Sequence, residues 1–85
     1  MTKIYPQGYI SANKMLIMDA KKLGKRIKLA RVEHDMTQGQ LAEAIGAKQK
    51  SISRYETGLS IPSLETLEKI AKALKKNFGY FLDVV

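Results

Sequence analysis

Residues 36–46 carry the start and stop signals of one short helix, and this constrains the fold more than any other feature of the sequence. Thr37 and Gln40 have the spacing of a capping box, in which each side chain accepts a hydrogen bond from the backbone N–H of the other residue. A hydrophobic staple across the same helix start is formed by Met36 and Leu41. Gly46 can adopt the positive φ angle that ends a helix. The sequence therefore predicts a helix over residues 38–45.

Similar signals predict four more helices around this one. Asp19 can cap a first helix that ends near Asp35, with Met18 and Leu23 as its staple. Its buried stripe is predicted to contain Leu23, Ile27, Ala30 and Arg31, while the lysines lie elsewhere, at positions 21, 22, 25 and 28. A third helix is expected over about residues 48–57, ending at Gly58.

The last two helices follow a loop over residues 59–62. Ser63 can cap a helix with Glu65 in its first turn, where a negative charge is favourable. The core stripe of this helix is predicted to contain Leu64, Leu67, Ile70, Ala71 and Leu74. Asn77 then opens a short terminal helix containing Phe78, Phe81 and Leu82. The whole pattern indicates an all-α domain with five helices over residues 19–85.

Residues 1–18 have a different character and are interpreted as an N-terminal arm. Pro6-Gln7-Gly8 lies between apolar pairs and fits a turn, and residues 15–18 form a short apolar run that fits a strand, so a short β-hairpin is one interpretation. In the other, the first helix extends back to Leu16, because Leu16 keeps helical spacing with Ala20, Leu23 and Ile27.

Composition narrows the class of protein further. The 85 residues leave room for one domain with one thin core. With no cysteine and one histidine, the chain has no disulfide framework and no cluster to complete a metal site, so we expect no metal and no cofactor. No apolar run reaches the roughly 18 residues of a membrane span, which favours a cytoplasmic protein. The net charge of +7 favours a polyanionic partner, although charge alone is a weak indication.

The segment over residues 48–57 shows how that charge is arranged. At about 100° per residue, its polar and cationic side chains fall within an arc of about 140°: Gln49, Lys50, Ser53, Arg54 and Thr57. On the opposite side lie Ser51, Ile52 and Tyr55. Glutamine, lysine and arginine are side chains that can read base edges in the major groove of DNA. The segment is therefore predicted to turn a DNA-reading face to solvent and an apolar face to the core.

These residues resemble the Cro and phage-repressor family of helix-turn-helix DNA-binding domains, which has the lambda-repressor-like fold. The resemblance covers roughly Leu23 to Leu82. Its motifs are Thr37-Gln38 with Leu41-Ala42, then Glu56-Thr57-Gly58, then Pro62-Ser63-Leu64, and they occur together at the family spacing. Each motif alone would be a weak indication.

The resemblance implies roles for the matching positions. Base contacts are implied for Gln49, Lys50 and Arg54. Phosphate contacts are implied for Gln38, Lys48, Ser53, Gly58 and Leu59, and Gln38 is also placed to brace the recognition helix. A structural salt bridge between the first and third helices is implied for Arg31 and Glu56.

The sequence departs from the family pattern at two of these positions. Lys48 stands where a serine or threonine commonly caps the third helix, and the loss of that cap costs about 1 kcal/mol. Its positive charge also opposes the helix dipole, which makes sense if a phosphate is the intended neighbour. Leu59 replaces a residue that is frequently basic, so we expect fewer phosphate contacts from this loop.

A few other side chains are expected to have structural roles and no role in binding or catalysis. His34 is expected to be a capping or surface residue, and Tyr55 a core residue with its hydroxyl near the surface. Leu29 and Val32 lie opposite the buried stripe of the first helix. We hypothesise that apolar residues of the arm cover them, within one chain or across a dimer: Tyr5, Tyr9, Ile10 or Ile17.

Together these observations predict a sequence-specific double-stranded DNA-binding transcriptional regulator, most simply a repressor, bound as a homodimer to an inverted repeat. The terminal helix and the arm are the expected dimer surfaces. An antitoxin that represses its own operon and binds a protein toxin is the alternative, and a phage repressor or restriction-modification controller is equally compatible. A general RNA-binding or membrane-surface protein would explain the charge but not the polar arc. An enzyme is not expected, because the chain lacks a nucleophile beside a base and a phosphate-binding glycine loop.

Overall fold

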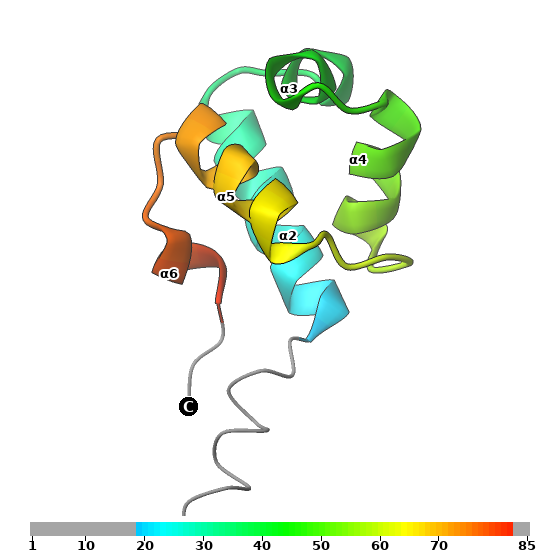
Figure 1. Ribbon diagram of the computed structural model, residues 1–85, viewed down its shortest axis with the longest axis vertical. Helices are drawn as coiled ribbons and strands as arrows, with labels where there is room; N and C mark the ends of the chain where they lie inside the picture. Colours follow the sequence, from blue (N-terminus) through cyan, green and yellow to red (C-terminus); the bar gives the residue numbers. More distant parts are fainter. Residues whose placement is uncertain (1–18, 83–85) are drawn as a thin grey trace, which may run out of the picture.

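The computed structural model describes residues 19–82, which form five α-helices and no strand (Figure 1). The helices are α2 (Ala20–Glu33), α3 (Gln38–Ile45), α4 (Gln49–Thr57), α5 (Leu64–Ala73) and α6 (Phe78–Phe81). The all-α fold with five helices is therefore confirmed. The interpretations of residues 1–18, the Met18 half of the first staple and the hypothesis that the arm covers Leu29 and Val32 lie outside the described residues.

Three of the helices begin with the side-chain caps that the sequence predicts. The Asp19 carboxylate accepts hydrogen bonds from the backbone N–H groups of Lys21 and Lys22. Thr37 and Gln40 form the complete capping box, with N···O distances of 2.8 and 3.0 Å. Ser63 accepts a bond from the backbone of Thr66. Each cap satisfies backbone donors that have no partner inside the helix, and so fixes where that helix starts.

The helix ends depend on residues in the left-handed region of backbone conformation. Gly46 (φ 71°) ends α3 and Gly58 (φ 83°) ends α4, as predicted. Two residues other than glycine, Asp35 and Lys75, adopt φ 55° directly after the C-caps of α2 and α5. This conformation is unfavourable for residues with a Cβ atom. It interrupts the helical backbone, so α2 ends at Glu33 and α5 at Ala73.

The core is one cluster to which all five helices contribute. Its fully buried large side chains are Ile27, Leu41, Ile52, Leu67, Ile70, Leu74 and Phe81. Burying one such side chain contributes about 1.5–3 kcal/mol. The side chains of Phe78, Tyr80 and Leu82 pack partly buried against the same cluster. The C-terminal segment therefore contributes to the core, and its role as a dimer surface stays a prediction.

One predicted core residue is wrong. Leu64 is 60% exposed, although it keeps helical spacing with the buried residues of α5. As the first residue of α5 it lies at the helix end, so the periodicity gives its direction but no neighbouring element covers it. Leu29 and Val32 on α2 are exposed, as predicted.

Helix α2 makes its most extensive contacts with α4, and glycine is essential to them. Gly24 is buried, and a Cβ atom at this position would lie 2.6 Å from the backbone oxygen of Glu56 and would also clash with that of Tyr55. Both clashes are with backbone atoms, which cannot turn away as a side chain can. Gly24 therefore sets the distance between α2 and the C-terminal half of α4.

Candidate nucleic-acid interface

Helices α3 and α4 form a compact unit joined by a short turn. Gly46 has open space around the position of a Cβ atom, so the turn requires glycine for its positive φ and not for lack of room. The turn brings the backbone N–H of Ala47 to the carbonyl of Ala42, at 2.8 Å. Figure 1 shows the two helices at one side of the molecule, with α6 at the other. This unit therefore presents α4 at the edge of the domain.

Helix α4 has one buried face and one exposed face. Ile52 is completely buried, and Tyr55 and Ser51 are half-buried beside it. Most of the predicted reading face is exposed: Gln49, Lys50, Arg54 and Thr57. Ser53 is half-buried. The predicted orientation of this helix is therefore observed, with its amide and cationic side chains in solvent and isoleucine in the core.

A buried ion pair holds α4 in this orientation. The Nε of Arg31 donates to Glu56 Oε2 at 2.6 Å, and Nη2 donates to Oε1 at 3.0 Å. Only 11% of the Arg31 side chain and 3% of the Glu56 side chain are exposed. Two parallel bonds from one guanidinium fix orientation as well as distance. The residues for which the family resemblance implies a salt bridge thus join α2 to α4.

The same network also includes α3. Gln38 Nε2 donates to Glu56 Oε1 at 3.0 Å, and Arg31 Nη1 donates to the carbonyl of Met36 at 2.7 Å. The hydrogen bonds that Arg31 donates to the Glu56 carboxylate raise the pKa of its guanidinium more than burial lowers it, so the group stays charged. Three helices therefore meet at one carboxylate. Gln38, expected to touch phosphate, also braces α4.

The N-terminal ends of α3 and α4 form the part of this surface best suited to an anion. Neither helix has an acidic residue in its first turn, so the partial positive charge of each end is not offset locally. Lys48 makes no side-chain capping bond, as predicted, and its side chain is exposed. The Gln49 amide oxygen lies 3.5 Å from where a Cβ of Gly39 would be, so Gln49 extends beside the start of α3. Gln49 therefore lies beside a helix start, where backbone donors are available.

The C-terminal end of α4 is fixed by the loop that follows it. Leu59 and Ser60 donate backbone hydrogen bonds to the carbonyl of Arg54, at 2.9 and 3.2 Å. The Arg54 Nε lies 3.4 Å from Ser60 Oγ. A Cβ on Gly58 would lie 3.1 Å from Lys21 Cγ and 3.3 Å from the Lys21 backbone. The predicted phosphate-contacting residues Gly58 and Leu59 therefore lie directly beside Arg54.

Two residues that help to position α4 and its side chains, Gly24 and Ser60, were not predicted from the sequence. Gly24 gave one available signal, a glycine inside a predicted helix, where glycine costs about 1 kcal/mol relative to alanine and so needs a packing reason. Ser60 gave none, because its contact with Arg54 depends on how the loop folds back.

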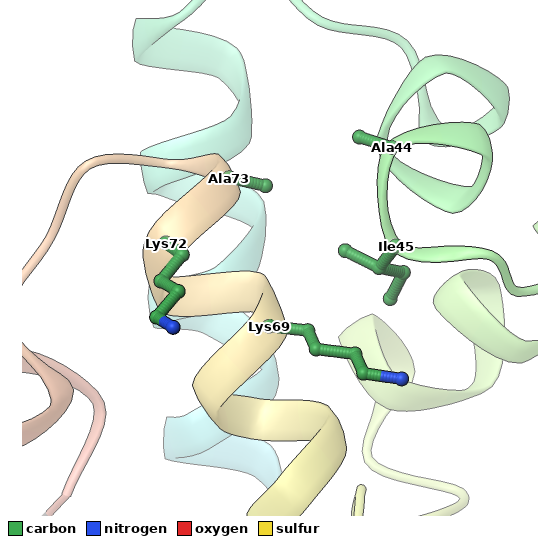
Figure 2. Close-up of a pocket in the computed structure, with 5 residues that line it drawn as sticks. All are labelled: Ala44, Ile45, Lys69, Lys72 and Ala73. Carbon is green, nitrogen blue, oxygen red and sulfur yellow. The ribbon is translucent and has the colours of Figure 1, made fainter.

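A groove elsewhere on the domain lacks catalytic groups. It has a volume of about 500 Å³ between α3 and α5, and Figure 2 shows its lining residues, Ala44, Ile45, Lys69, Lys72 and Ala73. None of these side chains is a carboxylate, imidazole or hydroxyl. Across residues 19–82, no three potential metal-ligating side chains gather. In the same range, no helix combines the length and apolar character needed to cross a bilayer.

A helix pair joined by a tight turn, with its second helix buried on one face and polar on the other, defines a helix-turn-helix domain. The chain belongs to the helix-turn-helix family, whose model matches residues 27–81. This range contains the second half of α2, the α3–α4 unit and the ion pair that supports it.

Curated relatives include regulators and an antitoxin. The chain is 41% identical over 63 residues to antitoxin PezA of Streptococcus pneumoniae, covering 74% of this chain and 38% of PezA. It is 40% identical over 55 residues to the ImmF control region 10 kDa protein of Bacillus phage phi105, covering 65% of this chain and 61% of that protein. The chain spans less than half the length of the first curated relatives it matches.

Solved structures share the fold over most of the chain. The restriction-modification controller protein C.AhdI of Aeromonas hydrophila aligns with a TM-score of 0.72 and 27% identity, covering 74% of this chain and 96% of that one. The P22 c2 repressor, solved in complex with a synthetic operator, aligns with a TM-score of 0.69 and 28% identity, covering 74% and 96%. These likenesses identify the fold as lambda-repressor-like.

Proposed function

We propose that this protein, a DNA-binding transcriptional regulator of the helix-turn-helix family, represses transcription as a homodimer bound to an inverted repeat. In this proposal α4 enters the major groove and α3 lies across the phosphate backbone. Bound protein then excludes polymerase from the promoter. The proposed site of action is the cytoplasm, and the mechanism is occupancy, with no catalytic step, cofactor or metal.

The observation that carries the proposal is the exposed face of α4. Gln49, Lys50 and Arg54 are all exposed on a helix that a buried isoleucine and a buried ion pair hold against the core. A rigid helix that offers amide and guanidinium groups to solvent is suited to bidentate contacts with adenine and guanine. We assign base contacts to these three residues.

The surroundings of α4 support phosphate contacts. The helix ends at Gln38 and Lys48 lack acidic residues, and phosphate oxygens can accept hydrogen bonds from backbone N–H groups there. Ser53, Gly58 and Leu59 border the same surface and are assigned to the backbone of the duplex. The net charge of +7 favours association with DNA of any base sequence.

Dimerisation is proposed on energetic grounds. One recognition helix makes few base contacts, whereas two half-sites one helical turn apart, about 34 Å, combine their binding free energies. Among the matched solved structures, the P22 c2 repressor is in complex with a synthetic operator.

Selection of preferred duplexes from a random pool tests the proposal. The expected result is enrichment of an inverted repeat whose half-site centres lie about one helical turn apart. Enrichment of a single unrepeated motif would contradict the dimer, and absence of any enriched sequence, with equal affinity for scrambled duplexes, would contradict sequence-specific regulation.

A second candidate function rests on the relative PezA, which is named an antitoxin. In that case the protein binds DNA in the same way and also binds a toxin. A toxin gene beside this one, and a stable complex of the two purified proteins, would support it. A regulator that forms no such complex and still recognises its inverted repeat would exclude it.

A further inference from the structure

Arg54 is bonded at two points to one residue of the loop that follows α4. The backbone N–H of Ser60 donates to the Arg54 carbonyl at 3.2 Å, and the Arg54 Nε donates to Ser60 Oγ at 3.4 Å. The first bond fixes where Ser60 lies relative to the helix end, and the second reaches the guanidinium itself. Among the three side chains assigned to base contacts, Arg54 is the one that bonds another side chain within residues 19–82.

The loop that contains Ser60 is supported at both ends. At its start, Gly58 has a φ angle of 83° and packs so closely on α2 that a Cβ atom would lie 3.3 Å from the backbone of Lys21. Near its end, Pro62 is buried. Ser60 itself is half-buried between them. Its hydroxyl is therefore attached to a backbone with little freedom, and it offers Arg54 an acceptor in a defined place.

The hydrogen bond to Ser60 limits how the Arg54 guanidinium can bind a base. A guanidinium has five N–H donors in one plane, and it can offer two parallel donors either from Nε and one Nη or from the two Nη atoms. Ser60 accepts from Nε, whereas neither Nη has a protein partner within the described range 19–82. The donors left for a ligand are therefore the end-on pair on the two Nη atoms.

Guanine is the base that matches this pair of donors. In the major groove it presents two acceptors, N7 and O6, and a bidentate arginine is the commonest specific contact to it. Adenine presents N7 beside an N–H donor, which a guanidinium cannot satisfy because it has no acceptor. A guanidinium already held by Ser60 also loses less rotamer freedom when it binds. The contact therefore favours one base and lowers the entropic cost of reading it.

We propose that Ser60 is a positioning residue for base recognition, which holds Arg54 so that its two Nη atoms read one guanine end-on. The inference rests on the proposed function for its DNA, and it adds a residue outside α4 that determines specificity. A Ser60 hydroxyl that bound phosphate would strengthen binding to every duplex alike. A positioning hydroxyl acts only at the base pair that Arg54 reads.

The contact is tested first in the free protein. NMR relaxation of the Arg54 Nε–H group reports how firmly this group is held on the ps–ns timescale. The group should become more mobile in Ser60→Ala, which removes its acceptor, and stay held in Ser60→Thr, which keeps a hydroxyl. Ser51→Ala is the matched control, because it removes a hydroxyl from the inner side of α4. Equal mobility in the wild type and in Ser60→Ala overturns the proposal, whether or not the protein binds DNA.

Base preference is tested on the operator selected above, at the base pair where Arg54→Ala relaxes discrimination. The affinity ratio between the operator and a duplex with this one pair exchanged should fall about 2- to 10-fold in Ser60→Ala, the range for one hydrogen bond. Ser60→Thr and Ser51→Ala should keep the wild-type ratio, and thermal melting verifies that each variant folds. Equal losses on both duplexes, an unchanged ratio in Ser60→Ala, or an A·T pair at this position would each overturn the proposal.

A double substitution separates positioning from a direct contact. In the Arg54→Ala background, Ser60→Ala should have no further effect on the affinity ratio, because the side chain that Ser60 holds is gone. Additive losses would show that Ser60 contacts DNA independently of Arg54, which overturns the proposal. If the Nε–H is held in the free protein but no duplex is preferred over a scrambled one, the proposed function fails, and the reading role of Ser60 fails with it.

Discussion

The two faces of α4 differ in how firmly they are held. On the inner face, Ile52 is completely buried, Glu56 is bound by two helices, and Gly24 allows backbone contact with α2. On the outer face, Gln49, Lys50 and Arg54 are exposed, and Arg54 has one long contact, with Ser60. The inner face thus fixes where the helix lies, and the outer face leaves side chains free to meet a ligand. Substitutions should separate the two roles.

The largest expected effect is on stability, from the inner face. Glu56→Ala removes the partner of a nearly buried guanidinium, which costs about 3–5 kcal/mol of unfolding free energy when a buried pair is broken. Chemical denaturation measures this loss. Gln38→Ala is the matched control, because it removes a single hydrogen bond to the same carboxylate and leaves the ion pair intact. Similar losses from both variants would show that the ion pair does not hold α4.

The next largest expected effects are also on stability, and they come from one glycine in α2 and one in α3. Gly24→Ala should destabilise by about 1–3 kcal/mol or more, because its methyl group would meet backbone oxygens of α4 and push the helices apart. Gly39→Ala has ordinary contact distances and should instead stabilise by about 0.5–1 kcal/mol, since alanine favours a helix. Melting temperatures of the two variants provide the comparison. A Gly24→Ala protein as stable as wild type would contradict the close approach.

The smallest expected effects come from Lys48 at the start of α4, where one substitution should change both stability and DNA binding. Lys48→Ser should restore a cap and stabilise the fold by about 0.5–1 kcal/mol. It should also weaken binding to every duplex and lower the slope of log affinity against log salt by about one. Denaturation and binding at several salt concentrations measure the two outcomes. A more stable variant with an unchanged salt slope would remove Lys48 from the phosphate contacts.

Sequence reasoning was most successful where local chemistry decides the structure. The limits of α3 follow from the capping box and Gly46, and α4 starts one residue later than predicted, because Lys48 is the N-cap itself. The two faces of α4 follow from helical periodicity alone. Such features depend on residues a few positions apart, which a single sequence displays directly.

Prediction from the sequence was less successful where the structure depends on contacts between segments far apart in the chain. Leu64 has the spacing of a core residue but no element reaches it, and the sequence did not show how far the terminal helix packs against the core. Gly24 matters because of two carbonyls more than thirty residues away in the chain. Neither coverage nor close approach can be read from periodicity, since both depend on which elements meet.

The central claim, that the outer face of α4 reads bases, is tested most directly with Arg54→Ala. Its affinity for the selected operator and for a scrambled duplex is measured at one salt concentration, with Lys72→Ala as a control that removes one positive charge from α5. Arg54→Ala should lose about 1–3 kcal/mol more of its binding free energy on the operator than on the scrambled duplex, and Lys72→Ala should show no such difference. Equal losses of Arg54→Ala on both duplexes would contradict it.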